Sequence, residues 1–252
     1  MSSVLPTRVE VLGCPLDILS ADNLLRRIEA ILDGNSLAHL VTLNPEYVML
    51  ARRDPAFRLA IERADLVVAD GIGVVRAASL LYGRSTERVP GVEIMDAVVA
   101  MSGRLKAPVY LLGGGPGVAQ RAIKKLRRRH PDACFAGHAG GWGPSIRDDD
   151  ASVTAIAASG ARVVLVAYGA PGQVTWIERN RARLTDAGVR LAVGVGGAFD
   201  FHAGDVPRAP VVVQRAGLEW LYRLARQPWR WRRQVSLPAF AWLVWQERRS
   251  RR

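Results

Sequence analysis

Six short apolar runs alternate with segments of helical periodicity, and this alternation restricts the fold more than any other feature of the chain. Each run ends in a glycine or a polar residue, as buried strands do where they meet a turn. Strands that alternate with helices build a mostly parallel sheet. The predicted strands lie in RVEVLG (8–13), AHLVTLN (38–44), DLVVADG (65–71), PVYLLGGG (108–115), RVVLVAYGAP (162–171) and RLAVGVGGAFD (190–200).

The segments between these runs carry helix signals. Asp54-Pro55 and Ala170-Pro171 indicate helix starts, because proline is favoured in the first helical turn. The periodicity predicts helices over 22–33, 71–82, 116–130, 148–159 and 171–184, and hence an α/β, Rossmann-like fold with a mostly parallel, helix-covered sheet. A chain of 252 residues can bury a full core. We expect one α/β domain over 1–214 and an appendage over 215–252.

The predicted appendage differs in composition from the rest of the chain. It holds ten arginines and two glutamates, a net charge of +8 out of +12 for the whole chain, and five of the seven tryptophans. Four apolar residues share one helical face that would pack against the body or a membrane, namely Leu218, Leu221, Tyr222 and Ala225. The run WRWRR (229–233) joins amphipathic rings to cations, which suits an anionic membrane surface. We predict a basic, Trp-rich, helical appendage that targets a membrane.

Membrane crossing is not expected. No run approaches the roughly 20 apolar residues that a spanning helix needs, and LPAFAWLVW (237–245) is short enough to lie in the interface instead. The first residues lack the apolar stretch of a signal peptide. Cys14 and Cys134 are isolated thiols, better explained as small core residues than as a disulfide. We therefore expect a cytoplasmic protein that associates peripherally with the inner face of the cell membrane.

Polar residues at the strand ends are the candidates for a site, because open parallel sheets bind ligands beyond the carboxyl ends of their strands. Asn44 precedes Pro45, and a helix N-cap is the simplest explanation for it. Capping does not explain Thr42. Asp70 ends a buried run beside glycines, where it is equally consistent with a general base and with a helix cap.

Three further strand ends carry weaker signals. Gly113, Gly114 and Gly115 open a strand-to-helix turn whose N–H groups would suit a diphosphate, although the segment is a poor dinucleotide fingerprint. Gln173 falls in the first turn of a predicted helix, from which its amide would reach the crevice. Asp200 lies in a glycine-spaced segment that is also consistent with a simple connecting loop.

A metal site is not expected from the sequence, and neither is another cofactor. Asp148, Asp149 and Asp150 fall in the first turn of a predicted helix, where carboxylates meet the helix dipole, so a solvated helix start explains them. The histidines are scattered without ligand spacing, at positions His39, His130, His138 and His202.

Several motifs together resemble the WecG/TagA/CpsF family of bacterial glycosyltransferases. They occur in the family's order between about Val9 and Arg233, nearly the whole chain. The motifs are TLNPEYVMLARRDPAFRLAIERADLVVADGIGVV, RVPGVEIMDA, YLLGGGPGVAQRA, VAYGAPGQVTWI, GVGGAFDFHAGDVPRAP and LEWLYRLARQPWRWRR. The resemblance implies an inverting, metal-independent transfer of a sugar, often of the N-acetylmannosamine type, from UDP to a polyprenyl-diphosphate-linked acceptor. Such products feed teichoic acid, common-antigen or exopolysaccharide synthesis.

The resemblance also implies roles for particular residues. The aspartate of the ADG motif, Asp70, is the expected general base. Four residues would position substrate or stabilise charge near the anomeric centre: Thr42, Asn44, Arg88 and Gln173. Asp200 would contact the nucleotide, and arginines of the appendage would close over the diphosphate, namely Arg223, Arg230 and Arg233. The chain departs from the family pattern at Glu93, where aspartate is common, and beside Gln173.

Two alternatives remain at this point. Interleaved arginine and tryptophan also suit a nucleic-acid-binding module, although we regard nucleic acid as the weaker choice of partner. An inactive protein that keeps the fold is the other. A homo-oligomer is compatible with the sequence, which does not distinguish oligomeric states.

Overall fold

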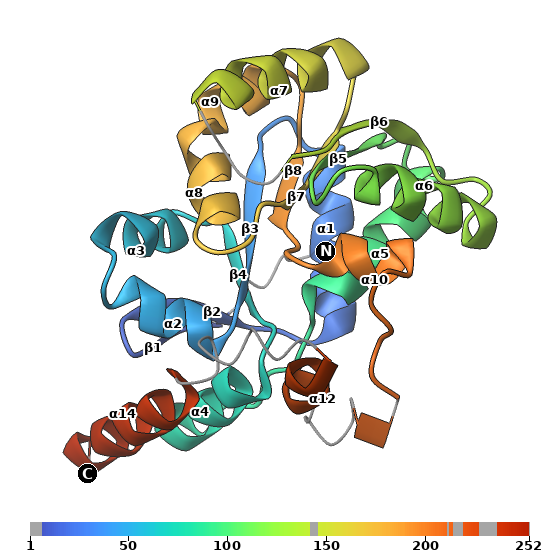
Figure 1. The fold of residues 1–252 in the computed structure, drawn as a ribbon. Helices are drawn as coiled ribbons and strands as arrows, with labels where there is room; N and C mark the ends of the chain where they lie inside the picture. Colours follow the sequence, from blue (N-terminus) through green and yellow to red (C-terminus); the bar gives the residue numbers. More distant parts are fainter. Residues whose placement is uncertain (1–6, 142–145, 211, 214–218, 227–235, 252) are drawn as a thin grey trace.

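A computed structural model describes residues 7–141, 146–210, 212–213, 219–226 and 236–251 (Figure 1). Its centre is a six-stranded sheet in the order β4-β3-β8-β7-β5-β6, and every pairing in it is parallel. The strands are β3 (Ala38–Leu43), β4 (Leu66–Ala69), β5 (Val109–Gly113), β6 (Phe135–Ala139), β7 (Val163–Ala167) and β8 (Leu191–Gly194). The α/β prediction is confirmed.

The first predicted strand does not join this sheet, which corrects the sequence-based assignment. Strand β1 (Thr7–Val11) pairs antiparallel with β2 (Cys14–Ile18), and Leu12 and Gly13 form the turn with φ values of 51° and 84°. Two central residues with positive φ match the twist of a tight hairpin. The Asp17 carboxylate pairs with Arg8 at 2.7 Å and accepts the Val67 N–H at 2.8 Å, which ties the hairpin to β4.

Helices surround the strands throughout the described part of the chain. They are α1 (Ala21–Asp33), α2 (Pro45–Ala51), α3 (Pro55–Glu62), α4 (Ile72–Tyr82), α5 (Gly91–Ser102), α6 (Val118–Arg129), α7 (Ile146–Ser159), α8 (Gly172–Arg179), α9 (Arg181–Asp186), α10 (Ala198–Ala203), α12 (Glu219–Arg226) and α14 (Ser236–Ser250). The predicted helix over 171–184 is two helices, because the Asn180 side chain donates to the Trp176 carbonyl at 3.1 Å and to Asp149 at 3.3 Å.

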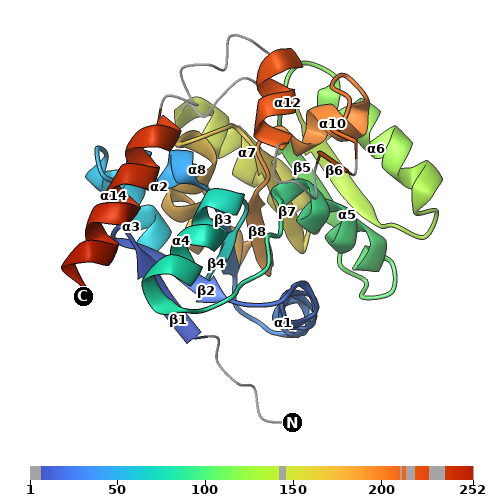
Figure 2. The ribbon, with the colours of Figure 1, turned by 90° about the horizontal axis from the view of Figure 1, so that it is seen from below.

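Helices cover both faces of the sheet, as the views in Figures 1 and 2 show. Alternate strand residues face opposite sides. Leu111, Leu165 and Val193 pack with α1, α5, α6 and α10, whereas Leu112 and Val166 pack with α7, α8 and α9. A third cluster joins the hairpin to α2, α3 and α4. These clusters fix the sheet rigidly, so the loops at its carboxyl edge are held in place.

Part of the predicted appendage packs against this body. Phe240 and Val244 of α14 are 4% exposed and join the cluster of α2 and α4 (Figure 2). Trp242 and Trp245 remain 55% and 50% exposed. The run 237–245 therefore has one face on the protein, which leaves only its other face for the expected membrane interface. In α12, Leu221 is 47% exposed, so its predicted stripe is not buried against the described body.

Two smaller expectations can also be compared with the structure. Asp149 is 5% exposed and pairs with Arg179 at 2.7 Å, so the acidic start of α7 is not simply solvated. Cys14 and Cys134 are both free, as expected, and burial raises the pKa of Cys14 to about 12. No helix of the described residues is long and apolar enough to cross a membrane.

Candidate active site

A pocket opens at the carboxyl ends of β3, β4 and β8. Strands β3 and β8 are neighbours in the sheet, but the chain leaves them in different directions. After β3 it continues toward β4, whereas after β8 it continues into α10, which packs on α5 and α6. Diverging connections of this kind create the crevice in which open α/β sheets bind ligands. The pocket has a volume of about 480 Å³, within the roughly 300–1,000 Å³ usual for small-molecule sites.

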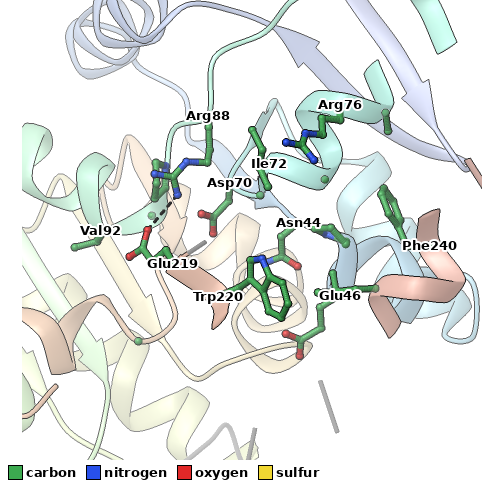
Figure 3. A pocket seen from close by; sticks show the side chains of 18 of the residues that line it. Asn44, Glu46, Asp70, Ile72, Arg76, Arg88, Val92, Glu219, Trp220 and Phe240 are labelled. Carbon is green, nitrogen blue, oxygen red and sulfur yellow. Dashed lines mark hydrogen bonds and ion pairs between the residues drawn. The ribbon is translucent and has the colours of Figure 1, made fainter. Parts of the chain in front are cut away.

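Both polar and apolar side chains line this pocket. Its charged members are Glu46, Asp70, Arg76, Arg88 and Glu219. Figure 3 shows Asp70 between Arg88 and Asn44, with Trp220 beside Asn44 and with Arg88 paired to Glu219. The apolar part comes mainly from α4 and α14, including Ile72, Leu80, Leu237, Phe240 and Val244.

Asp70 follows β4 directly and lies where the starts of α2 and α4 meet. Its backbone N–H donates to the Leu43 carbonyl at 2.8 Å, which extends the pairing of the two strands to the pocket. The N-cap of α4 is Gly71. A Cβ on Gly71 would lie 2.8 Å from Cδ of Pro45, so only glycine allows the two helix starts to approach this closely. The carboxylate of Asp70 therefore lines the pocket from a closely packed stretch of backbone between β4 and α4.

Asn44 has both of the roles that its sequence position suggests. It caps α2, since its Oδ1 accepts the Tyr47 N–H at 3.0 Å, and it lines the pocket. The cap uses only the carbonyl oxygen of the side chain. The cap thus fixes the orientation of the side-chain amide, and its N–H groups are the part of Asn44 that can donate hydrogen bonds to a ligand in the pocket.

Thr42 and Gln173 lie beneath the pocket rather than in its lining. Thr42 is 4% exposed and donates through Oγ1 to the Gly194 carbonyl at 3.4 Å. Gln173 is 2% exposed; its Nε2 donates to the Tyr47 hydroxyl at 2.7 Å, and its Oε1 accepts the N–H of Gly196 at 3.0 Å. Oε1 also accepts the Gly169 N–H at 3.2 Å. The amide thus joins the loops after β7 and β8 to α2, instead of reaching into the crevice.

Arg88 is held by a charge from the far end of the chain. Its guanidinium donates to Glu219 at 3.2 Å, across a separation of 131 residues. Arg208 lies 3.9 Å from the other oxygen of Glu219 and pairs with Glu93 at 2.5 Å. This network attaches α12 to the rim of the pocket. Glu219 and Arg208 were not predicted as site residues, since no local pattern indicates a pair so distant in sequence.

The other predicted binding residues fall into two groups. The glycines of 113–115 and Asp200 do not line this pocket, and the arginines of the appendage lie wholly or partly outside the described residues. The N–H of Gly114 donates to the Ala167 carbonyl at 3.1 Å, and added Cβ atoms on Gly113 and Gly114 would meet Tyr168 and Phe199 at 2.8 and 3.2 Å. Gly115 belongs to the same packed turn, and Asp200 lies in α10. Three arginines complete the predicted set. Arg223 lies in α12 with its side chain outside the description, and Arg230 and Arg233 lie outside the described residues.

The arrangement suits chemistry on an anionic ligand that carries a hydroxyl group. A carboxylate at a strand end can accept a proton, and a neighbouring guanidinium can bind phosphate oxygens in pairs. Across the described segments, no three His, Cys, Asp or Glu side chains converge as metal ligands would. Fold and site together are those of an α/β enzyme with a crevice at the carboxyl edge of its sheet that brings charged groups together.

The chain belongs to the glycosyl transferase WecG/TagA/CpsF family, whose pattern it matches over residues 9–252. It is similar to the N-acetylglucosaminyldiphosphoundecaprenol N-acetyl-beta-D-mannosaminyltransferase of Bacillus spizizenii, with 34% identity over 87% of this chain and 83% of that protein. A protein of the same name from Bacillus subtilis strain 168 is 30% identical over 85% of this chain and 82% of its own length. The resemblance inferred from the motifs is confirmed.

Proposed function

We propose that the protein transfers a sugar of the N-acetylmannosamine type, or a related hexose, from a UDP donor to a polyprenyl-diphosphate-linked sugar. The names of both relatives specify a diphosphoundecaprenol-linked N-acetylglucosamine and an N-acetylmannosaminyl group. The product would enter cell-surface polysaccharide synthesis, such as that of teichoic acids or exopolysaccharides.

The observation that carries the proposal is the convergence of Asn44, Asp70 and Arg88 in one pocket at the carboxyl edge of the sheet. An inverting transfer is a single displacement, in which a base removes the proton of the attacking hydroxyl while the nucleoside diphosphate departs. Asp70 is the proposed base. Asn44 would orient the sugar through its amide N–H groups.

Negative charge grows on the departing diphosphate, and the enzyme must stabilise it. We propose a metal-independent transfer in which arginines do this, because guanidinium groups bind diphosphate oxygens bidentately. Arg88 is the proposed contributor among the residues around the pocket. Arg223, Arg230 and Arg233 of the appendage remain proposed contributors, as do Gly113–Gly115 and Asp200 for the nucleotide.

Thr42 and Gln173 have an indirect part in this proposal. Both are buried, and Gln173 connects Tyr47 to the loop after β8. Because Tyr47 donates its N–H to the Asn44 cap, Gln173 would position Asn44 through Tyr47. The acceptor is a lipid, so we propose that the protein works on the cytoplasmic face of the cell membrane, to which its appendage attaches it.

The proposed base is tested by the Asp70→Asn variant. General acid–base catalysis contributes about 10²- to 10⁴-fold, so kcat should fall by about that factor while donor binding persists. Turnover is measured by mass spectrometry with UDP-sugars and a lipid-diphosphate N-acetylglucosamine acceptor. Asp33→Asn, at the exposed end of α1, is the matched control. Full turnover by Asp70→Asn would contradict the assignment of Asp70 as the general base.

A further inference from the structure

The pocket has two chemically different ends. At the edge of the sheet it is polar, with Asn44, Asp70 and Arg88. Away from the sheet it continues between α4 and α14, where nearly all of its lining is apolar. A donor sugar nucleotide has no hydrocarbon chain that would extend along this second end. The ligand that fits both ends is one that is polar at one end and hydrocarbon at the other.

Two helical stripes form the apolar end, which we name the α4–α14 groove. The lining residues of α14 are Leu237, Phe240, Ala241 and Val244, and the stripe on α4 consists of Gly73, Arg76, Ala77 and Leu80, with Ile72 beside it at the start of the helix. Both sets follow i, i+3, i+4, i+7 spacing, so each is one continuous face of its helix. Helix α4 lies close to both of its neighbours here, since a Cβ on Gly73 would lie 2.8 Å from Cγ of Pro45, the first residue of α2, and 3.5 Å from the Phe240 ring of α14.

Arg76 is the one charged residue of these two stripes. Its guanidinium is turned toward the side of the pocket on which Ile72 and Asp70 lie (Figure 3). Arg88 is already paired to Glu219 at 3.2 Å. Arg76 has no carboxylate within ion-pair distance among the described residues, although it lines a pocket that contains three of them. An unpaired guanidinium beside an apolar wall is a site for an anion attached to a hydrocarbon chain.

Resting on the proposed function, we propose that Arg76 binds the diphosphate of the acceptor and that the α4–α14 groove holds the adjoining isoprenoid units. The order of groups supports this assignment. At about 1.5 Å of rise per residue, Arg76 lies about 6 Å and Leu80 about 12 Å along α4 from Ile72, the first residue after the Asp70 loop. The acceptor has the same order: a sugar hydroxyl, then a diphosphate, then a hydrocarbon chain.

The outer surface supports a lipid as the occupant of the groove. Leu80, at the far end of the α4 stripe, is 48% exposed. Trp242 and Trp245 are exposed on α14, the helix that forms the opposite wall. Exposed tryptophans are favoured at the headgroup level of a bilayer. A chain that enters between α4 and α14 would thus pass directly from a membrane surface into the pocket.

The groove is tested by narrowing it with Ala241→Phe. The acceptors are N-acetylglucosamine diphosphates that differ only in carrying a farnesyl chain or a methyl group. The wild-type protein should prefer the farnesyl acceptor. The Ala241→Phe substitution should raise the KM of the farnesyl acceptor at least tenfold while leaving the KM of the methyl acceptor unchanged. Gln246→Phe adds the same ring at an exposed position of α14 outside the pocket lining, and it should change neither value.

The arginine is tested by Arg76→Gln, with Arg128→Gln on the exposed face of α6 as the charge-matched control. A lost charge-assisted contact to a phosphate should raise the KM of both diphosphate acceptors about tenfold or more. The KM of the UDP-sugar should stay constant. A raised donor KM with unchanged acceptor KM would assign Arg76 to the donor and overturn the inference.

The two proposals fail in different ways. Equal use of the farnesyl and methyl acceptors, unaffected by Ala241→Phe, would overturn the groove and leave the transferase function intact. No transfer to any diphosphate acceptor would overturn the proposed function, and the acceptor site with it. Circular dichroism of each variant separates a local change in binding from loss of the fold.

Discussion

At the scale of single residues, Gln173 shows how a motif residue can act through its neighbours. Its side chain is 2% exposed and makes hydrogen bonds to Tyr47, Gly169 and Gly196. A Cβ on Gly194 would lie 2.8 Å from Cγ of Gln173, so the amide fills the space that this glycine leaves. The glutamine is a positioning residue that joins three loops beneath the pocket.

We therefore expect Gln173→Leu to destabilise the protein. The substitution leaves the N–H groups of Gly169 and Gly196 without their acceptor and removes the donor to the Tyr47 hydroxyl, and each unsatisfied N–H group costs about 1–3 kcal/mol. Urea unfolding should show a free energy of unfolding lower by about 2–5 kcal/mol. Gln120→Leu, on the exposed face of α6, should change it little. A stable Gln173→Leu protein that had lost turnover would instead indicate direct contact with substrate.

At the scale of elements, a cluster of ionisable side chains around the buried His39 links strand β3 to helices α8 and α9. His39 on β3 is 0% exposed, and its Nδ1 lies 3.6 Å from Glu178, which pairs with Arg181 at 3.0 Å. Arg181 also pairs with Asp65 at 2.8 Å. Burial lowers the pKa of His39 below 6.5, and this effect exceeds the opposing attraction of Glu178. The folded protein therefore favours the neutral form of this imidazole.

This lowered pKa predicts a stability that depends on pH. The unfolded chain binds a proton at His39 near its ordinary pKa of 6.5, whereas the folded protein resists protonation. The contribution of the buried, neutral His39 to the free energy of unfolding is thus complete above pH 6.5 and is lost as the pH falls below that value. Urea unfolding at a series of pH values in this range gives the free energy of unfolding as a function of pH. This free energy should change less steeply with pH for His39→Gln than for wild type. His138→Gln, at an exposed position, should keep the full slope; an equal slope in all three proteins would refute the assignment.

At the scale of the whole molecule, the appendage combines attachment to the body with an exposed surface of tryptophan and arginine side chains. Arg88 and Glu219 tie α12 to the rim of the pocket, and Phe240 and Val244 bury one face of α14. The other face shows Trp245, with the Arg249 guanidinium 4.2 Å from its ring centre. Tryptophan with neighbouring arginine is suited to the headgroup layer of an anionic bilayer.

Deleting residues 215–252 should therefore lower both liposome binding and turnover, because it removes the proposed membrane-binding surface together with α14, which forms one wall of the pocket. The double variant Trp242→Ala/Trp245→Ala should lower only liposome binding, since both side chains are about half exposed. Vesicle flotation and a detergent-solubilised acceptor measure the two properties separately. Undiminished turnover of the deletion on a lipid acceptor would contradict the dual role. A salt-sensitive gel shift lost on the same deletion would support nucleic-acid binding instead.

Sequence patterns by themselves determined the α/β class, the strand ends with Asn44 and Asp70, and the family. These properties follow from local periodicity, helix starts and short motifs, all of which are contained within neighbouring residues. Tertiary structure alone decided that β1 leaves the sheet, that Gln173 turns inward and that Glu219 meets Arg88 across 131 residues. It also decided that α14 forms one wall of the pocket. Such outcomes depend on contacts between segments distant along the chain, which no local pattern encodes.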